Sequence, residues 1–225
     1  MKDAALFTLI PYLFVLIAYL IGAIPFGYIM GKLSGVDLRE HGSKNIGATN
    51  AWRVLGAAKG LTVFILDFLK GFLPVLGAYL WVTAYQSELS DTAAILTVVL
   101  VGFATIIGHT YTCFLNFKGG KGVATTAGVL FAFSWEVGLV TLLSWIVPFR
   151  LSGYVSLGSI IAAVVMMVYG SYYFWPFGEH GDIANIAYVA FFIFIGSLVI
   201  IKHRANIGRL MRGEESSILK SKKKA

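Results

Sequence analysis

The sequence predicts an all-α, polytopic membrane protein with seven transmembrane segments, two of them short, and with motif-bearing loops on the cytoplasmic side. Three observations support this fold class. Hydrophobic residues make up 58% of the 225 residues and charged residues only 13%, against roughly 25% charged residues in a soluble domain. Long apolar runs recur along the chain, and basic residues gather between some of them. We expect residues 1–225 to form a single integral membrane domain, with a lysine-rich cytoplasmic tail at residues 220–225.

Five apolar runs reach the roughly 20 residues that a membrane-spanning helix needs. In chain order they are residues 6–30, 61–84, 92–114, 155–175 and 183–201. The first run is too long for the core of a signal peptide and is expected to be retained. A sixth run, residues 123–149, forms either one tilted span or two half-length helices that are interrupted around residues 134–138.

The distribution of basic residues favours two half-length helices, because short cytoplasmic loops collect Lys and Arg. Of the 18 basic residues, 16 lie in residues 32–59, 118–121 and 202–224 and at Arg150, whereas two intervening turns carry only acidic residues. Those turns contain Glu88 and Asp91, and Glu179 and Asp182. If residues 123–149 enter the membrane and return, all 16 lie on one side. The net charge of +7 then marks membrane orientation, and no nucleic acid is expected as a partner.

The first basic loop, residues 39–56, combines glycines with donor side chains. The donors are those of Ser43, Asn45, Thr49 and Asn50. We expect a short helix that is capped by Thr49 or Asn50, carries Arg53 and ends at Gly56. A helix start beside a guanidinium suits a phosphate. The alternative is a polar loop that rests on lipid headgroups.

The second basic loop is rich in glycine: Gly119, Gly120, Lys121 and Gly122 precede the apolar run at residue 123. Glycines allow backbone amides to approach an anion, and the lysine and the following helix start add positive charge. The spacing and the preceding strand of a nucleotide-binding phosphate loop are both missing, and an ordinary turn remains the alternative. His109 ends the span before this loop and lies within possible reach of the same site.

The third motif continues the last span. At helical spacing His203 and Asn206 share one face, with Arg209 beside it. The alternative for His203 is a hydrogen-bonded structural residue. Ser159, near the start of the span at residues 155–175, either binds substrate or permits close helix packing.

Two charged residues fall inside the second span. Asp67 and Lys70 are three residues apart on one helix face, which predicts either mutual neutralisation or a proton path. The single cysteine, Cys113, excludes an intrachain disulfide and a metal site built from cysteines, and no two histidines have metal-ligand spacing. We therefore expect no metal and no cofactor.

Three donor-rich loops on one membrane face, two of them suited to phosphate, predict an enzyme in which a phosphorylated, water-soluble substrate meets a substrate from the bilayer. A membrane transporter of phosphate or phosphate esters, with the same loops as gates, is the alternative. Such a transporter needs polar residues across the full membrane depth. The oligomeric state is left open.

Three segments together resemble the bacterial acyl-phosphate:glycerol-3-phosphate acyltransferase family, PlsY. They are residues 40–50 with Arg53, residues 108–125, and residues 203–207 with Arg209. The resemblance covers essentially the whole chain. It implies transfer of a fatty acyl group from acyl phosphate to the 1-hydroxyl of glycerol 3-phosphate, which forms lysophosphatidic acid and inorganic phosphate in the first acylation of phospholipid synthesis. It also implies a multi-pass protein of the bacterial inner membrane with a cytoplasmic active site and no coenzyme A thioester.

The resemblance and the loop chemistry give the candidate site. The catalytic candidates are Ser43, Arg53, Lys121, His203 and Asn206. The substrate-binding candidates are these five with Asn45, Thr49, Asn50, Gly119, Gly120, Gly122 and Ser159. Either His203 or a substrate phosphate is expected to take the hydroxyl proton. The expected partners are acyl phosphate, glycerol 3-phosphate and membrane lipids.

Overall fold

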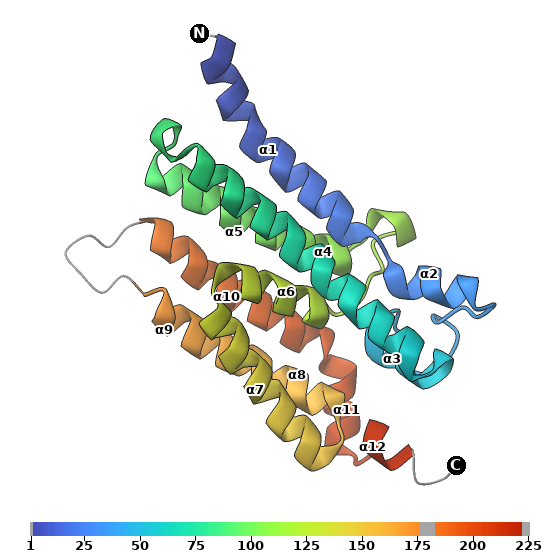
Figure 1. Cartoon of the computed structure of the whole chain (residues 1–225). Coiled ribbons are helices and arrows are strands. Elements are labelled where there is room, and N and C mark those ends of the chain that lie inside the picture. Colours follow the sequence, from blue (N-terminus) through green and yellow to red (C-terminus); the bar gives the residue numbers. More distant parts are fainter. Residues whose placement is uncertain (1, 176–182, 222–225) are drawn as a thin grey trace.

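The chain is mainly helical in the part that its computed structural model describes, residues 2–175 and 183–221, and no strand occurs there. The α-helices are α1 Lys2–Ala23, α2 Phe26–Leu33, α3 Ala48–Leu55, α4 Ala57–Ala84, α5 Asp91–Thr110, α6 Val123–Phe133, α7 Trp135–Ser152, α8 Val155–Val165, α9 Ser171–Tyr173, α10 Ile183–Lys202, α11 Arg204–Met211 and α12 Ile218–Ser221. A π-helical turn, Met166–Gly170, joins α8 to α9. Figure 1 shows the long helices side by side, with α2, α3, α11 and α12 at one end.

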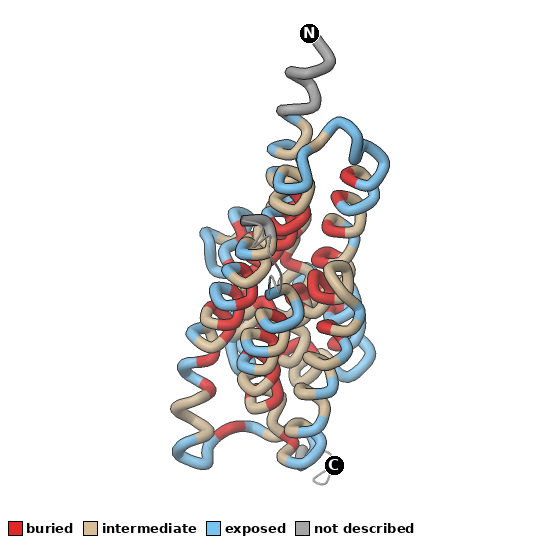
Figure 2. The backbone as a smooth tube through the Cα atoms, turned by 90° about the vertical axis from the view of Figure 1, so that its left-hand side faces the viewer, coloured by how far each residue is buried: buried red, intermediate tan, exposed pale blue. Residues whose placement is uncertain are grey.

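Five helical stretches of the described chain are long and apolar enough to cross a membrane. They are Leu9–Leu33, Ala57–Ala84, Asp91–Leu115, Val155–Tyr173 and Asn185–Lys202. Their outward faces are apolar too: on α1, Leu9, Leu13 and Leu16 are all more than half exposed. Figure 2 shows such exposed positions alternating with buried ones along the helices. A surface of this kind fits lipid rather than water, and the fold class of an all-helical, multi-pass membrane protein is confirmed.

The first predicted span, residues 6–30, is not one continuous helix. Helix α1 ends at Ala23, and α2 begins after Pro25. A proline disfavours helical geometry at the residue before it, here Ile24, and has no N–H to continue the helical hydrogen bonds. The chain therefore bends at Pro25 and runs through α2 into the first basic loop.

The interruption of residues 123–149 is confirmed. Ser134 has extended backbone angles between α6 and α7, and its Oγ accepts the N–H of Val137 at 3.3 Å as the cap of α7. The start of α6 contacts α11 through Lys121 and Asn206, and the Gly153 carbonyl just after α7 accepts the Ile218 N–H at 3.1 Å. The two helices therefore start and finish at the same end of the bundle. Helix α6 is the shorter one, and the total of seven membrane segments stays a prediction.

Helices α4 and α6 pack closely because glycines face the partner backbone. A β-carbon at Gly71 would overlap the Thr125 carbonyl oxygen, and one at Gly128 would overlap the Phe68 carbonyl oxygen. Small residues allow such close approach between membrane helices. The packing fixes α6, and with it the glycine loop, against α4. The acidic turn with Glu179 and Asp182 and the end of the lysine-rich tail lie outside the described residues.

Candidate functional site

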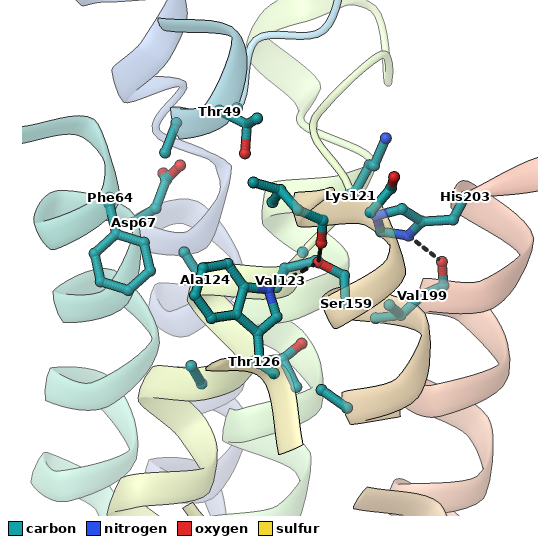
Figure 3. Close-up of a pocket in the computed structure, with 18 of the residues that line it drawn as sticks. Thr49, Phe64, Asp67, Lys121, Val123, Ala124, Thr126, Ser159, Val199 and His203 are labelled. Atoms are coloured by element: carbon teal, nitrogen blue, oxygen red, sulfur yellow. Dashed lines mark hydrogen bonds between the residues drawn. The ribbon is translucent and has the colours of Figure 1, made fainter. Parts of the chain in front are cut away.

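The three basic motifs meet around one cavity of about 410 Å³ at the end of the bundle that carries α3 and α11 (Figure 3). Ten of the twelve predicted site residues line it: Ser43, Asn45, Thr49, Asn50, Arg53, Lys121, Gly122, Ser159, His203 and Asn206. Gly119 and Gly120 do not line it. Residues from four separate segments therefore converge on one space.

The first basic loop contains the predicted short helix. Helix α3 carries Arg53 and ends at Gly56, as expected. The predicted capping is wrong, because the helix begins one residue after Gly47, and Thr49 and Asn50 lie inside it. The guanidinium of Arg53 is half-buried at the cavity, where burial lowers its pKa from the ordinary value; an arginine still stays protonated.

Asn50 is buried beneath this loop and uses its whole amide to hold it. Its Oδ1 accepts the Ser43 N–H at 2.8 Å, and its Nδ2 donates to the carbonyls of Leu38 and His41 at 3.1 and 3.0 Å. The Ser43 side chain is left exposed at the cavity. Asn50 thus positions Ser43, and because both N–H donors of its amide are in use, donation from Asn50 to a substrate would replace one of these bonds.

The glycine loop divides into two halves with different partners. The N–H of Gly119 donates to the Thr110 carbonyl at 3.2 Å, and that of Gly120 donates to the His109 carbonyl at 3.1 Å. These two amides therefore face α5 instead of the cavity. The half that is free to bind an anion is Lys121, Gly122 and the start of α6, where the first backbone N–H groups have no partner within the helix.

Lys121 lies where the second and third motifs meet. Its Nζ donates to Oδ1 of Asn206. Burial lowers the pKa of Lys121 to about 8; Glu215 opposes that shift, while the positive charges of Arg209 and Arg53 reinforce it. Lys121 is therefore a cation at neutral pH, positioned for an anion.

His203 lies at the junction of α10 and α11, so the predicted continuous helix bends there. Its Nδ1 is 2.7 Å from the Val199 carbonyl, which makes Nδ1 the donor and leaves Nε2 with its lone pair. Burial, reinforced by the charge of Lys121, lowers the pKa of His203 to about 4. The imidazole is therefore neutral at pH 7. Figure 3 shows Lys121, Ser159 and His203 on one side of the cavity and Phe64 and Asp67 on the other.

Glu215 connects the motifs and was missed by the sequence analysis. Its carboxylate is buried and accepts hydrogen bonds from Ser156 Oγ at 2.8 Å, Asn206 Nδ2 at 2.7 Å and Arg209 Nε at 2.7 Å. Burial by itself would raise the pKa of Glu215, but these three hydrogen bonds outweigh it and hold the pKa below its ordinary value. The carboxylate stays charged and fixes Asn206, the partner of Lys121.

The segment around Glu215 folds back across the cavity. Helix α11 ends at Met211, and the chain reverses at Gly213, whose φ of +69° favours glycine. Arg53 then donates to the Ser216 carbonyl at 2.9 Å. The carboxy-terminal segment therefore joins α3, α8 and α11. No motif spacing pointed to Glu215, because its partner Ser156 is 59 residues away and the chain reversal at Gly213 is needed to bring the carboxylate back to Asn206 and Arg209.

Beyond its polar end, the cavity continues as an apolar groove between α4 and α7, with α6 and α8 as its other walls. Apolar lining residues are Leu61, Phe64, Leu130, Leu142, Trp145 and Met166. Ser159 stands at the boundary: its Oγ donates to the Val155 carbonyl at 2.9 Å and accepts Trp145 Nε1–H at 3.2 Å. A cationic end joined to an apolar groove suits an amphiphile that carries phosphate. Within the described residues, no three His, Cys, Asp or Glu side chains gather where they could hold a metal ion.

Comparison with known proteins gives a consistent result over nearly the whole chain. The family described as "Glycerol-3-phosphate acyltransferase" matches residues 12–213. A glycerol-3-phosphate acyltransferase of Aquifex aeolicus is 44% identical over 201 residues, covering 89% of this chain and 95% of the relative. One of Fusobacterium nucleatum is 40% identical over 207 residues, covering 91% and 96%.

Two solved structures share the fold. A crystal structure of PlsY, an integral membrane glycerol 3-phosphate acyltransferase, in its glycerol 3-phosphate form superposes with a TM-score of 0.78 at 40% identity, covering 92% of this chain and 95% of that one. The lysophosphatidic acid form has a TM-score of 0.75 at 39% identity, with 92% and 94% covered.

Proposed function

The chain belongs to the glycerol-3-phosphate acyltransferase family, and from this premise we propose that it transfers a fatty acyl group from an acyl phosphate to the 1-hydroxyl of glycerol 3-phosphate. The products are lysophosphatidic acid and inorganic phosphate. We place the protein in the inner membrane of a bacterium with its site facing the cytoplasm, because the basic loops that form the site mark the cytoplasmic side.

One observation carries the proposal: a half-buried cation, Lys121, lies between an uncapped helix start and an apolar groove. Lys121, Arg53 and the first amides of α6 can hold phosphate groups by charge and hydrogen bonds. The groove beside them accepts the acyl chain. This arrangement brings a soluble phosphate ester and a lipid-derived donor together at one point.

The chemistry follows from these positions. The hydroxyl oxygen attacks the acyl carbonyl carbon, a new ester C–O bond forms, and the C–O bond to the phosphate breaks. Phosphate leaves with the bonding electron pair, while Lys121 and Arg53 stabilise its charge. The hydroxyl proton passes to a substrate phosphate in preference to His203, because a pKa of about 4 makes that imidazole a weak base. His203 Nε2 instead accepts a hydrogen bond that orients the hydroxyl.

The transporter alternative receives less support from the cavity. Its cationic side chains gather at the end where the motifs meet, and the groove beyond is lined mainly by apolar residues. A path for phosphate across the membrane would need polar groups at every depth.

The test is phosphate release from an acyl phosphate by purified protein, with and without glycerol 3-phosphate, together with detection of lysophosphatidic acid. Lys121→Ala and Arg53→Ala should each lower kcat/KM by about 100-fold or more, the effect of losing one charge-stabilising group in a buried site. Lys118→Ala is the matched control, since Lys118 is exposed in the same loop and does not line the cavity. Parent protein that released no phosphate but carried glycerol 3-phosphate into liposomes would contradict acyl transfer.

A further inference from the structure

A buried charged cluster, Asp67, Lys70 and His109, packs against the glycine loop. Asp67 and His109 also line the cavity, and none of the three has a role in the chemistry above. The three residues are only 2%, 4% and 6% exposed. Lys70 Nζ is 2.7 Å from Asp67 Oδ1 and donates to the Ile24 carbonyl at 2.7 Å. The predicted mutual neutralisation of Asp67 and Lys70 is therefore confirmed. It does not explain His109, whose Nδ1 lies 3.6 Å from the same Asp67 oxygen.

The other side of His109 supports the glycine loop. The His109 carbonyl accepts the Gly120 N–H, and the imidazole lies directly against the Gly120 α-carbon. A β-carbon at Gly120 would overlap Nε2 of His109, whereas one at Gly119 would overlap the His109 carbonyl oxygen. One residue therefore contacts two successive glycines, one through its ring and the other through its backbone.

We propose that His109, which faces the Asp67–Lys70 ion pair, is a positioning residue that sets where the glycine loop presents Lys121 and the α6 amides to the substrate phosphate. The role of that phosphate as part of glycerol 3-phosphate rests on the proposed function. Asp67 faces Nδ1, so the ring presents its Nε2 edge to Gly120, and Lys70 keeps Asp67 in place.

The cluster matters because the Gly119–Gly120 part of the loop lies on His109, whereas Lys121 has a further contact with Asn206. The N–H groups of Gly119 and Gly120 bond only to the end of α5, and Lys121 follows at once. A displacement of about 1 Å in a positioning group can lower a rate about 100-fold. The ring of His109 thus limits how far the loop can sink away from the phosphate.

A double-mutant cycle tests the contact through the ring. Gly120→Ala should raise KM for glycerol 3-phosphate about tenfold or more with a smaller effect on kcat, because its new methyl pushes the loop off the ring. His109→Ala removes the three atoms nearest to that methyl. In the double variant His109→Ala, Gly120→Ala, the fold-increase in KM should therefore be clearly smaller than the product of the fold-increases in the two single variants.

Gly119→Ala is the matched control for this cycle. Its methyl meets the His109 backbone oxygen, which His109→Ala leaves in place, so the second cycle should show no recovery. If the fold-increases in KM simply multiplied in both cycles, with no recovery in either double variant, the proposal would be overturned. Calorimetric binding of inorganic phosphate to the same detergent-purified variants should follow the same order. This measurement does not depend on acyl transfer. If the proposed function were wrong, the parent protein would show no acyl transfer, but the order of phosphate affinities among the variants would be unchanged.

A second pair of variants separates positioning from folding. Asp67→Asn leaves the Lys70 charge unpaired in a buried place and should lower Tm. Asp67→Asn combined with Lys70→Met removes both charges and should restore Tm toward the parent value, while KM for glycerol 3-phosphate stays raised, since His109 has lost its carboxylate. Recovery of both Tm and KM in the double variant would show that the cluster only neutralises charge, and would overturn the proposal.

Discussion

Lys121 and His203 show how burial sets the protonation of single residues in this site. Both lie beside the same cavity, and burial pushes both pKa values down, to about 8 and about 4. The lysine keeps its charge at neutral pH and the histidine has none. The pair therefore offers a cation for phosphate and a neutral acceptor for a hydroxyl.

The pH dependence of kcat/KM should report Lys121. In the free enzyme kcat/KM follows the protonation state of the essential groups, and the charged form of Lys121 is present below its pKa and lost above it. We expect kcat/KM for glycerol 3-phosphate to fall above about pH 8. In Lys121→Arg the guanidinium stays protonated, so the rate should be lower but this limb should disappear. A limb that persists unchanged in Lys121→Arg would assign it to another group.

Single residues also show what sequence patterns can and cannot predict. Arg53, Lys121 and Asn206 stand in dense, donor-rich motifs, and the structure brings all three to one cavity. Glu215 stands in no motif, and its partner Ser156 is 59 residues away in the chain. Only the chain reversal at Gly213 brings the carboxylate to Asn206, and no periodicity or spacing encodes that contact.

At the scale of helices, apolar runs predicted where the long elements lie, and local backbone chemistry decided where they stop. The run at residues 155–175 corresponds to a continuous helical stretch from Val155 to Tyr173. The run at residues 6–30 breaks at Pro25, a signal that hydropathy alone does not register. Hydropathy and spacing also could not predict which way the Gly119 and Gly120 N–H groups point, because their direction depends on the carbonyls at the end of α5.

The break between α6 and α7 gives a topological prediction. Helix α6 has 11 residues and is about 16 Å long at 1.5 Å per residue, about half of a hydrocarbon core of roughly 30 Å. Glu136, just after the break, should therefore lie far from the membrane face that carries the basic loops. In a Cys113→Ser background, Lys118→Cys should react in intact inverted vesicles with a membrane-impermeant thiol reagent. Glu136→Cys should not react from that side, and strong labelling there would contradict the re-entrant arrangement.

At the scale of the whole molecule, the helices form one cavity with a polar end and an apolar groove. The polar end is formed by loops with polar and charged side chains, and the groove is formed by membrane helices with apolar side chains. In the proposed reaction, the soluble substrate enters at the polar end and the acyl chain lies in the groove. Chain-length selectivity should therefore be set by groove residues that are remote from the charged groups.

Leu142 on α7 tests this division of labour. Leu142→Trp should fill part of the groove and displace about two methylenes of a long acyl chain, at about 0.8 kcal/mol each, so kcat/KM for palmitoyl phosphate should fall about tenfold. Octanoyl phosphate should lose much less. Leu143→Trp is the matched control, because the neighbouring Leu143 is half exposed on the outer face and does not line the cavity. If both variants changed the palmitoyl-to-octanoyl ratio of kcat/KM equally, the acyl chain would have to lie elsewhere, since only one of the two side chains faces the groove.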